Sequence, residues 1–167
     1  MAYDFAIGRD SRTRRFWGCL RAGLLTLVLA VAGDAAKSVA DELAILVIET
    51  AAGEDISFRV ELAQTADERS LGLMHRDRLD SDSGMLFLYP TERVVTMWMH
   101  QTRIPLDMLF IRGDGTIERI HERAVPYSEA IISSGEPVIA VLELNGGTAS
   151  RYGIAPGDTV IMPEGAH

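Results

Sequence analysis

The chain has 167 residues, a length typical of one domain, and a formal net charge of −8. The charge is unevenly spread, because residues 41–167 hold ten basic and 21 acidic side chains, a net charge of −11 with neutral histidines. A segment this acidic is repelled by phosphate backbones and shows no basic patch, which excludes nucleic-acid binding as a function class.

Residues 1–40 have the order of a secretory signal: a basic segment, an apolar segment and small residues. Three arginines at positions 12–15 precede the apolar run 24–32, and small residues suited to cleavage follow. The run is shorter than the ~20 residues that span a bilayer, although an uncleaved N-terminal anchor stays an alternative. We therefore expect a periplasmic or secreted protein. It would contact a membrane only if the signal stays uncleaved, and then only through that signal. Cys19 precedes the apolar run, so the mature chain has no cysteine for a disulfide.

Residues 41–167 consist of short apolar or alternating segments separated by turn residues, a pattern typical of β-strands. Strands that follow one another through tight turns favour antiparallel pairing. The sequence therefore predicts one mainly β domain, a compact antiparallel or mixed sheet that forms a barrel or sandwich with one or two short helices. The expected strands are 43–48, 56–62, 84–89, 94–99, 108–111, 116–125, 138–144 and 159–162.

Two short helices are predicted between these strands. Thr65-Ala66-Asp67-Glu68 has the form of a capping box, in which the first side chain accepts the fourth amide and the fourth side chain reaches back. This box predicts a helix from residue 66 to about residue 73. Two glycines precede a second helix, residues 148–152, which Gly153 is expected to end.

The stretch from residue 94 to residue 110 carries the densest mix of chemically active side chains. Its polar bend, residues 100–103, lies between two apolar segments and is bracketed by Trp98 and Asp107. The simpler interpretation of this stretch is structural. Its methionines would fill core gaps, Trp98 would be largely buried, and Asp107 would accept backbone amides.

The functional interpretation makes the same stretch a binding cleft. Trp98 would supply a flat platform, and Gln101 and Thr102 would supply hydrogen bonds. Asp107 would be an anionic anchor. An arginine from the first helix region would pair either with Asp107 or with a carboxylate of the ligand. Glu143 has apolar neighbours, so it either faces solvent or is a partly buried acid that pairs with an arginine and has a perturbed pKa. The candidate ligand-binding residues are Arg69, Arg76, Trp98, Gln101, Thr102, Asp107 and Glu143.

Several motifs resemble the DUF192 family of small, often exported domains of unknown function. Residues 69–76 resemble the family's Arg-x-x-Gly-Leu-Met-x-Arg motif, residues 84–87 its GMLF strand, and residues 98–107 its central WMKNT-x-IPLD signature. The resemblance covers almost the whole mature domain and implies a compact β-rich fold with no known substrate. His100-Gln101 stands where the family usually has Lys-Asn, so any chemistry that needs this lysine would be absent here.

Three function classes stay open. The first is a non-enzymatic binding module for a small polar ligand, a glycan or a peptide, with its cleft around residues 98–107. The second is a carboxylate-based hydrolase that uses Asp107 and Glu143 on a glycoside. Only carboxylates and histidines are left for such chemistry, because the mature chain has no cysteine, no Gly-x-Ser-x-Gly elbow and no HExxH motif. No catalytic residue can be assigned from the sequence.

The third class is periplasmic copper handling through Met97, Met99 and His100, because thioethers bind Cu(I). Strand alternation places the histidine opposite the two methionines, so this site would need a bulge or bend. No motif predicts a cofactor or a resident metal. For the favoured cleft, Asp107→Asn and Trp98→Ala are each expected to abolish ligand binding.

Overall fold

The structure is a computed structural model, and it describes residues 43–166. The predicted signal segment, with Cys19, lies outside the described residues. Between residues 43 and 166 the chain forms seven strands and two short helices, which confirms the mainly β prediction. These elements are β1 (Ala44–Glu49), β2 (Asp55–Ala63), α1 (Ala66–Leu71), β3 (Ser83–Met97), β4 (Leu106–Ile111), β5 (Ile117–Ala124), β6 (Ile132–Asn145), α2 (Thr148–Tyr152) and β7 (Thr159–Ile161).

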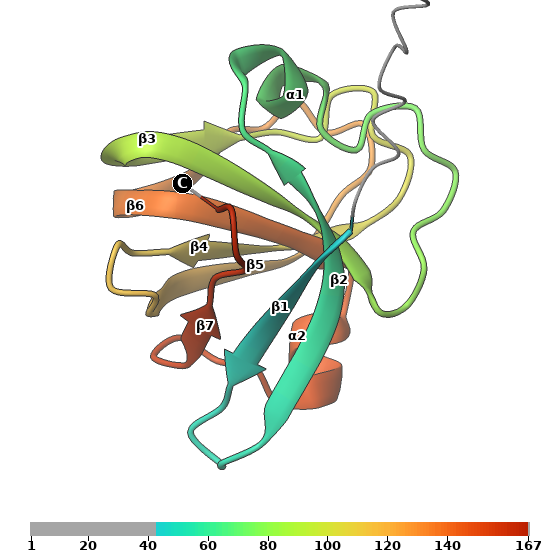
Figure 1. The fold of residues 1–167 in the computed structure, drawn as a ribbon. Coiled ribbons are helices and arrows are strands. Elements are labelled where there is room, and N and C mark those ends of the chain that lie inside the picture. Colours follow the sequence, from blue (N-terminus) through green and yellow to red (C-terminus); the bar gives the residue numbers. More distant parts are fainter. Residues whose placement is uncertain (1–42, 167) are drawn as a thin grey trace, which may run out of the picture. The chain divides into compact units, whose positions relative to one another are not determined.

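The strands form one mixed sheet in the order β5-β4-β6-β3-β2-β1-β7. Neighbouring strands pair antiparallel, except that β2 and β3 are parallel. A parallel pair needs a long crossover, and the segment between these two strands carries α1. The sheet curls into a half-barrel (Figure 1), and a bridge between Thr116 and Thr159 joins its two edges at one end.

Two of the predicted strands are one long strand in the structure. The segments 84–89 and 94–99 both fall within β3, apart from the last two residues, Trp98 and Met99. Pro90 lies between them, where the pairing of β3 with β6 shifts register between Leu88 and Arg93. Proline lacks the amide proton that a regular ladder needs, so it suits this irregularity without ending the strand.

Both helix predictions are confirmed near their expected bounds. Thr65 accepts the Glu68 amide while the Glu68 side chain accepts the Thr65 amide, so the capping box forms at α1. Gly153 ends α2 in the left-handed conformation that glycine adopts without strain. No helix in the described part of the chain is long and apolar enough to cross a membrane.

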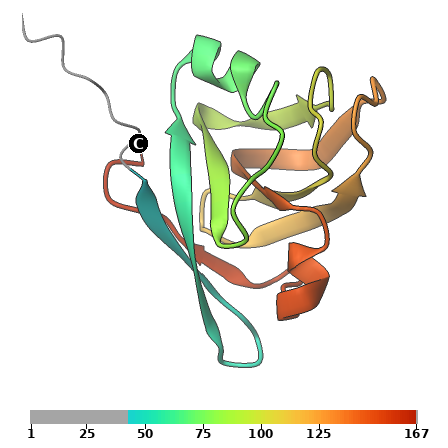
Figure 2. The same ribbon diagram turned by 90° about the vertical axis from the view of Figure 1, so that its right-hand side faces the viewer.

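The sheet has two covered faces, each with its own apolar cluster. On one face, Leu142 and Leu144 of β6 pack in the same cluster as Ala149 of α2, and we call it the α2 face. The other face packs Phe87 and Val141, and we call it the α1 face because α1 and the turn after it adjoin this cluster. The two helices lie at opposite ends of the curled sheet in both views (Figures 1 and 2).

Candidate functional site

A narrow pocket opens on the α1 face, between α1 with its following turn and the end of β3. Its volume is about 30 Å³, enough for a water molecule or one terminal group of a ligand but not for a ring. Its wall combines polar groups with apolar and aromatic side chains. We call it the Glu143 pocket, and its lining includes Arg69, Leu71, Phe87, Met97, Trp98, Thr102 and Glu143.

Glu143 reaches this pocket from the middle of the sheet. Its residue is 4% exposed, and β6 places it between Met85 of β3 and Met108 of β4. Among residues 43–166 its carboxyl has no hydrogen-bond or ion-pair partner, and burial raises its pKa to about 8. The group is therefore mostly protonated at pH 7. The structure confirms the predicted alternative in which Glu143 is buried and has a perturbed pKa. The predicted ion pair between Glu143 and an arginine is not formed.

The two candidate arginines are held by other protein groups. The Nη1 of Arg69 donates to the backbone carbonyls of Gln64 and Leu88, and its guanidinium lies 5.2 Å from the centre of the Tyr89 ring. Arg76 forms a two-pronged ion pair with Glu61. Arg69 lines the Glu143 pocket, whereas Arg76 lines a neighbouring depression. The prediction that one of them pairs with Asp107 is wrong.

Asp107 is a structural residue. It is fully buried, and its Oδ1 accepts the amides of Arg123 and Gly147, both at 2.8 Å. Its Oδ2 accepts the amide of Ala149 at 2.9 Å. These bonds tie the end of β5 and the first turn of α2 to β4. The structural interpretation of Asp107 is confirmed, and its prediction as the anionic anchor of a ligand is wrong because no oxygen faces solvent.

Asp107 and Glu143 also point to opposite faces of the sheet. In the β4–β6 ladder Met108 pairs with Glu143, and Asp107 pairs with Leu144. Paired residues share a face and successive residues alternate, so Asp107 faces α2. Trp98 lines a pocket on the other face. The predicted convergence of Trp98 and Asp107 is therefore wrong, and an Asp107–Glu143 pair cannot act on one glycosidic bond.

Trp98 is more accessible than the sequence predicts. It lies just past the end of β3, is 46% exposed, and stacks on His100 with the ring centres 4.7 Å apart. The predicted burial of this aromatic side chain is therefore wrong, whereas the predicted alternation holds, because the neighbouring Met99 is fully buried. Thr102 is buried and donates to the carbonyl of His100.

The Glu143 pocket adjoins a broader hollow that we call the outer depression. The outer depression has a volume of about 430 Å³, and Ser70, Leu71, Met74 and Trp98 line both spaces. Gln101 lines only the outer depression. Of the seven candidates, Arg69, Trp98, Thr102 and Glu143 therefore line the narrow pocket, Gln101 lies at its approach, and Arg76 and Asp107 lie outside both spaces.

Three loops meet near this approach with unusual backbone angles. His75, Gln101 and Tyr127 all have positive φ, between 51° and 64°, although none is glycine. Hydrogen bonds connect the loops: the His75 amide donates to the carbonyl of Gln101, and the Tyr127 amide donates to the carbonyl of Thr102. Such strain is often concentrated at functional sites. No sequence signal points to it, because glycine is the residue that usually marks positive φ.

The sequence also missed the apolar wall that α1 and its turn contribute. In the sequence, Leu71 and Met74 belong to a short predicted helix and a motif, and nothing in their spacing places them over β6. Only the parallel crossover from β2 to β3 brings this segment across the α1 face.

The predicted copper ligands are not arranged for one site. Met99 is fully buried in the α1-face cluster, which confirms the core-packing interpretation and removes its sulfur from solvent. The hydroxyl of Tyr89 lies 3.7 Å from the sulfur of Met97, and His100 Nδ1 lies 2.9 Å from Glu129. In the described residues no three His, Cys, Asp or Glu side chains gather where they could hold a metal ion.

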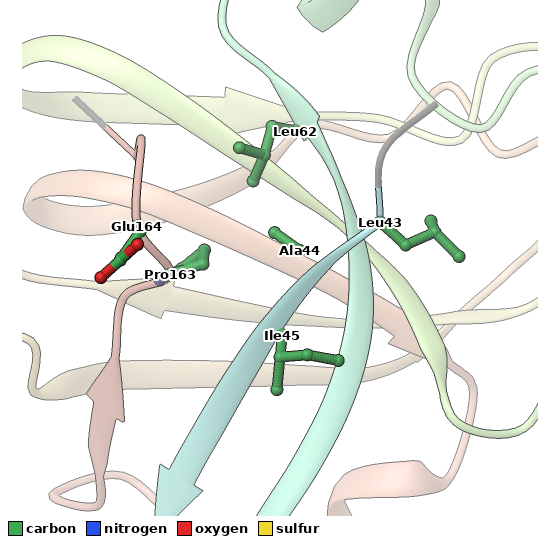
Figure 3. Close-up of a pocket in the computed structure, with 6 residues that line it drawn as sticks. All are labelled: Leu43, Ala44, Ile45, Leu62, Pro163 and Glu164. Carbon is green, nitrogen blue, oxygen red and sulfur yellow. The ribbon is translucent and has the colours of Figure 1, made fainter. Parts of the chain in front are cut away.

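A second depression lies where β1, β2 and the C-terminal segment meet (Figure 3). Its volume is about 450 Å³, and apolar side chains such as Ile45 and Leu62 line it. Its one ionisable lining group, Glu164, is exposed. Because it contains no buried polar group that could orient a ligand, the Glu143 pocket is the better candidate.

Comparisons with known proteins place the chain among uncharacterised relatives. The DUF192 family model, described as "Uncharacterized ACR", matches residues 47–162. A crystal structure from Sinorhizobium meliloti 1021, described as a candidate transcription regulator, is 52% identical with a TM-score of 0.70; the match covers 71% of this chain and 92% of that one. A protein of unknown function from Novosphingobium aromaticivorans DSM 12444 is 41% identical with a TM-score of 0.70, covering 72% of this chain and 85% of that one. No curated protein matches the sequence.

Proposed function

The chain belongs to the DUF192 family, and we propose that its domain is a non-enzymatic binding module for a small polar ligand, which it takes up in the Glu143 pocket. One observation carries the proposal: the carboxyl of Glu143, a residue that is 4% exposed, lines a pocket without a partner in the described residues. Buried polar groups are nearly always hydrogen-bonded, so such a group marks a place where a ligand completes the structure.

The shape of the site supports a ligand with a small polar tip. A pocket of about 30 Å³ excludes a sugar or aromatic ring from contact with Glu143. The rest of the ligand would lie in the outer depression, where Trp98 offers a half-exposed ring as a platform. A peptide side chain or a small linear molecule fits this division better than a glycan does.

Charge argues against a function on nucleic acid. The Sinorhizobium relative is described as a candidate transcription regulator. Residues 41–167 of this chain carry a net charge of −11, and counter-ion release cannot favour binding of a polyanion by such a surface. We therefore do not extend that description to this chain.

Export is part of the same proposal. The basic, apolar and small residues of positions 1–40 support it, although they lie outside the described residues. A fusion of residues 1–45 to alkaline phosphatase, which is active only after export, is expected to be active. An inactive but expressed fusion would contradict export.

The binding proposal is tested by screening small polar fragments against the ¹⁵N-labelled protein by NMR. Hits are expected to shift the indole N–H of Trp98. Leu71→Arg is expected to block the approach, because Leu71 lines both spaces and is 58% exposed, so the change leaves the core intact. Ile45→Arg is the matched control at a 56% exposed residue of the other depression. Fragments that still bind after Leu71→Arg but no longer bind after Ile45→Arg would place the site in the depression that Ile45 lines, and would overturn the proposal.

A further inference from the structure

We propose that the Glu143 pocket takes a primary ammonium group, carried by a lysine side chain or a small alkylamine, with the Glu143 carboxylate as its counter-ion. This inference rests on the proposed function and names its ligand class. Two features of the site point to it: the wall of the pocket and the charges that face Glu143.

The wall suits an alkyl chain that ends in a cation. Phe87, Met97 and Trp98 line the pocket beside the carboxyl, and Leu71 lines its approach. Apolar side chains of this kind pack against methylene groups, and aromatic rings attract a cation over their faces. The volume of about 30 Å³ matches a terminal ammonium and excludes a branched or cyclic head group.

The charges around Glu143 leave the carboxyl without a cation of its own. From α1, Arg69 is held by two backbone carbonyls and lies over the ring of Tyr89. From β3, Tyr89 is partly buried and also faces Arg93, whose guanidinium lies 5.8 Å from its ring centre. Arg76, after α1, pairs with Glu61 of β2. A ligand ammonium would therefore supply the missing counter-charge.

The approach to the pocket also favours a cation. Asp67 lines the outer depression, and Glu129 lies beside His100 at the same approach. Residues 41–167 as a whole carry a charge of −11, which raises the local concentration of cations. The same negative charges would repel a ligand carboxylate.

The protonation of Glu143 gives the inference a distinctive pH dependence. Burial raises the pKa of this carboxyl to about 8, so the empty pocket is mostly neutral at pH 7. An ammonium binds the ionised form, so its binding releases a proton and its affinity rises by up to about tenfold per pH unit below pH 8. Above pH ~10 the affinity falls again, because the amine itself loses its proton. A ligand that accepts a hydrogen bond from the neutral carboxyl shows the opposite trend between pH 6 and pH 8.

The experiment titrates n-butylamine, butyramide and butyrate into the full-length ¹⁵N-labelled protein at pH 6, 7 and 8. Affinity is read from the indole N–H of Trp98, and a Trp17→Phe variant assigns this signal because the chain has two tryptophans. We expect butylamine to bind with an affinity that increases with pH, and we expect Glu143→Gln to weaken it at least tenfold. Glu136→Gln, the same change at an exposed position of β6, is the matched control and is expected to leave the affinity unchanged.

The outcomes separate the inference from the proposed function. If butyramide or butyrate binds in a Glu143-dependent way and butylamine does not, the pocket stands and the ammonium inference is overturned. If Leu71→Arg also abolishes butylamine binding, the amine enters through the outer depression, as inferred. If none of the three probes shifts the Trp98 signal of the wild-type chain, both the ligand class and the binding pocket are overturned.

Discussion

Asp107 and Glu143 lie on adjacent strands and differ by one step of the β4–β6 register, so their carboxyls point to opposite faces of one sheet. The first accepts three backbone amides, and the second has no partner among residues 43–166. The same chemical group therefore stabilises the fold on one face and destabilises it on the other. Neutral amide substitutions at the two positions are expected to have opposite consequences.

Asp107→Asn is expected to lower the free energy of unfolding by about 1–3 kcal/mol, because the new NH₂ group cannot accept an amide and leaves a buried donor unsatisfied. Urea denaturation measures this change. Asp114→Asn is the control, since its carboxylate accepts one amide in an exposed turn and a much smaller change is expected. Loss of ligand binding with unchanged stability would instead return Asp107 to the binding site.

Glu143 is expected to make the stability of the domain fall as the pH rises. Burial raises the pKa of its carboxyl to about 8 from 4.5, so between these values the folded state binds one proton more than the unfolded state. The free energy of unfolding then decreases by up to about 1.4 kcal/mol per pH unit, and the contribution is complete below pH ~4.5 and lost above pH ~8.

Urea denaturation at pH 5, 6, 7 and 8 measures this contribution as the difference between the wild-type chain and Glu143→Gln. The glutamine is neutral at every pH, so the variant is expected to gain stability relative to the wild type as the pH increases. Two curves that stay parallel across this range would show that Glu143 is ionised in the folded state. That result would place an unseen cation or water network beside it.

Trp98→Ala is expected to leave the fold intact while it removes binding. Trp98 is 46% exposed and its ring contact is with His100, so its removal is expected to cost about 1 kcal/mol. Phe87→Ala, in the core beside the same pocket, is expected to cost about 3–5 kcal/mol. Thermal unfolding followed by circular dichroism compares the two. A loss at Trp98 as large as that at Phe87 would show that the tryptophan is a core residue.

The sequence predicted local features well because local physics determines them. The capping box at Thr65 and Glu68 needs only four consecutive residues, and Gly153 ends α2 for reasons confined to one turn. Alternation in ISFRVEL likewise predicted the buried positions Phe58 and Val60 of β2. Four of the seven candidate residues line one pocket, because the polar and aromatic groups of the motifs are indeed close in space.

The pairing of distant segments was beyond the sequence. Asp107 and Glu143 could share a face or oppose each other depending on a one-residue register between β4 and β6, which no local pattern specifies. The parallel pairing of β2 with β3 was equally hidden, and it is this crossover that carries α1 over the α1 face. The wall of the pocket therefore follows from topology and not from any motif.

The helix α1 is attached to the rest of the domain by few contacts. None of its residues is buried, so little apolar packing holds it in place. The capping box and the bonds from Arg69 to the carbonyls of Gln64 and Leu88 are its main fixed contacts. Because Leu71 lines both the Glu143 pocket and the outer depression, the position of α1 determines the shape of the site.

Arg69→Met keeps an apolar stem and removes the guanidinium that joins α1 to β3. Hydrogen exchange is expected to quicken at the amides of residue 69 and Gly72, which donate within α1, while the amides of β4 and β6 keep their protection. Affinity for any ligand of the pocket is expected to fall in the same variant, since the wall is no longer held. Arg78→Met, a change at an exposed arginine after the turn, is the control and is expected to alter neither quantity. Unchanged exchange in Arg69→Met would mean that the capping box alone fixes α1, and Thr65→Ala, which removes about 1 kcal/mol of capping energy, would then produce the same loosening.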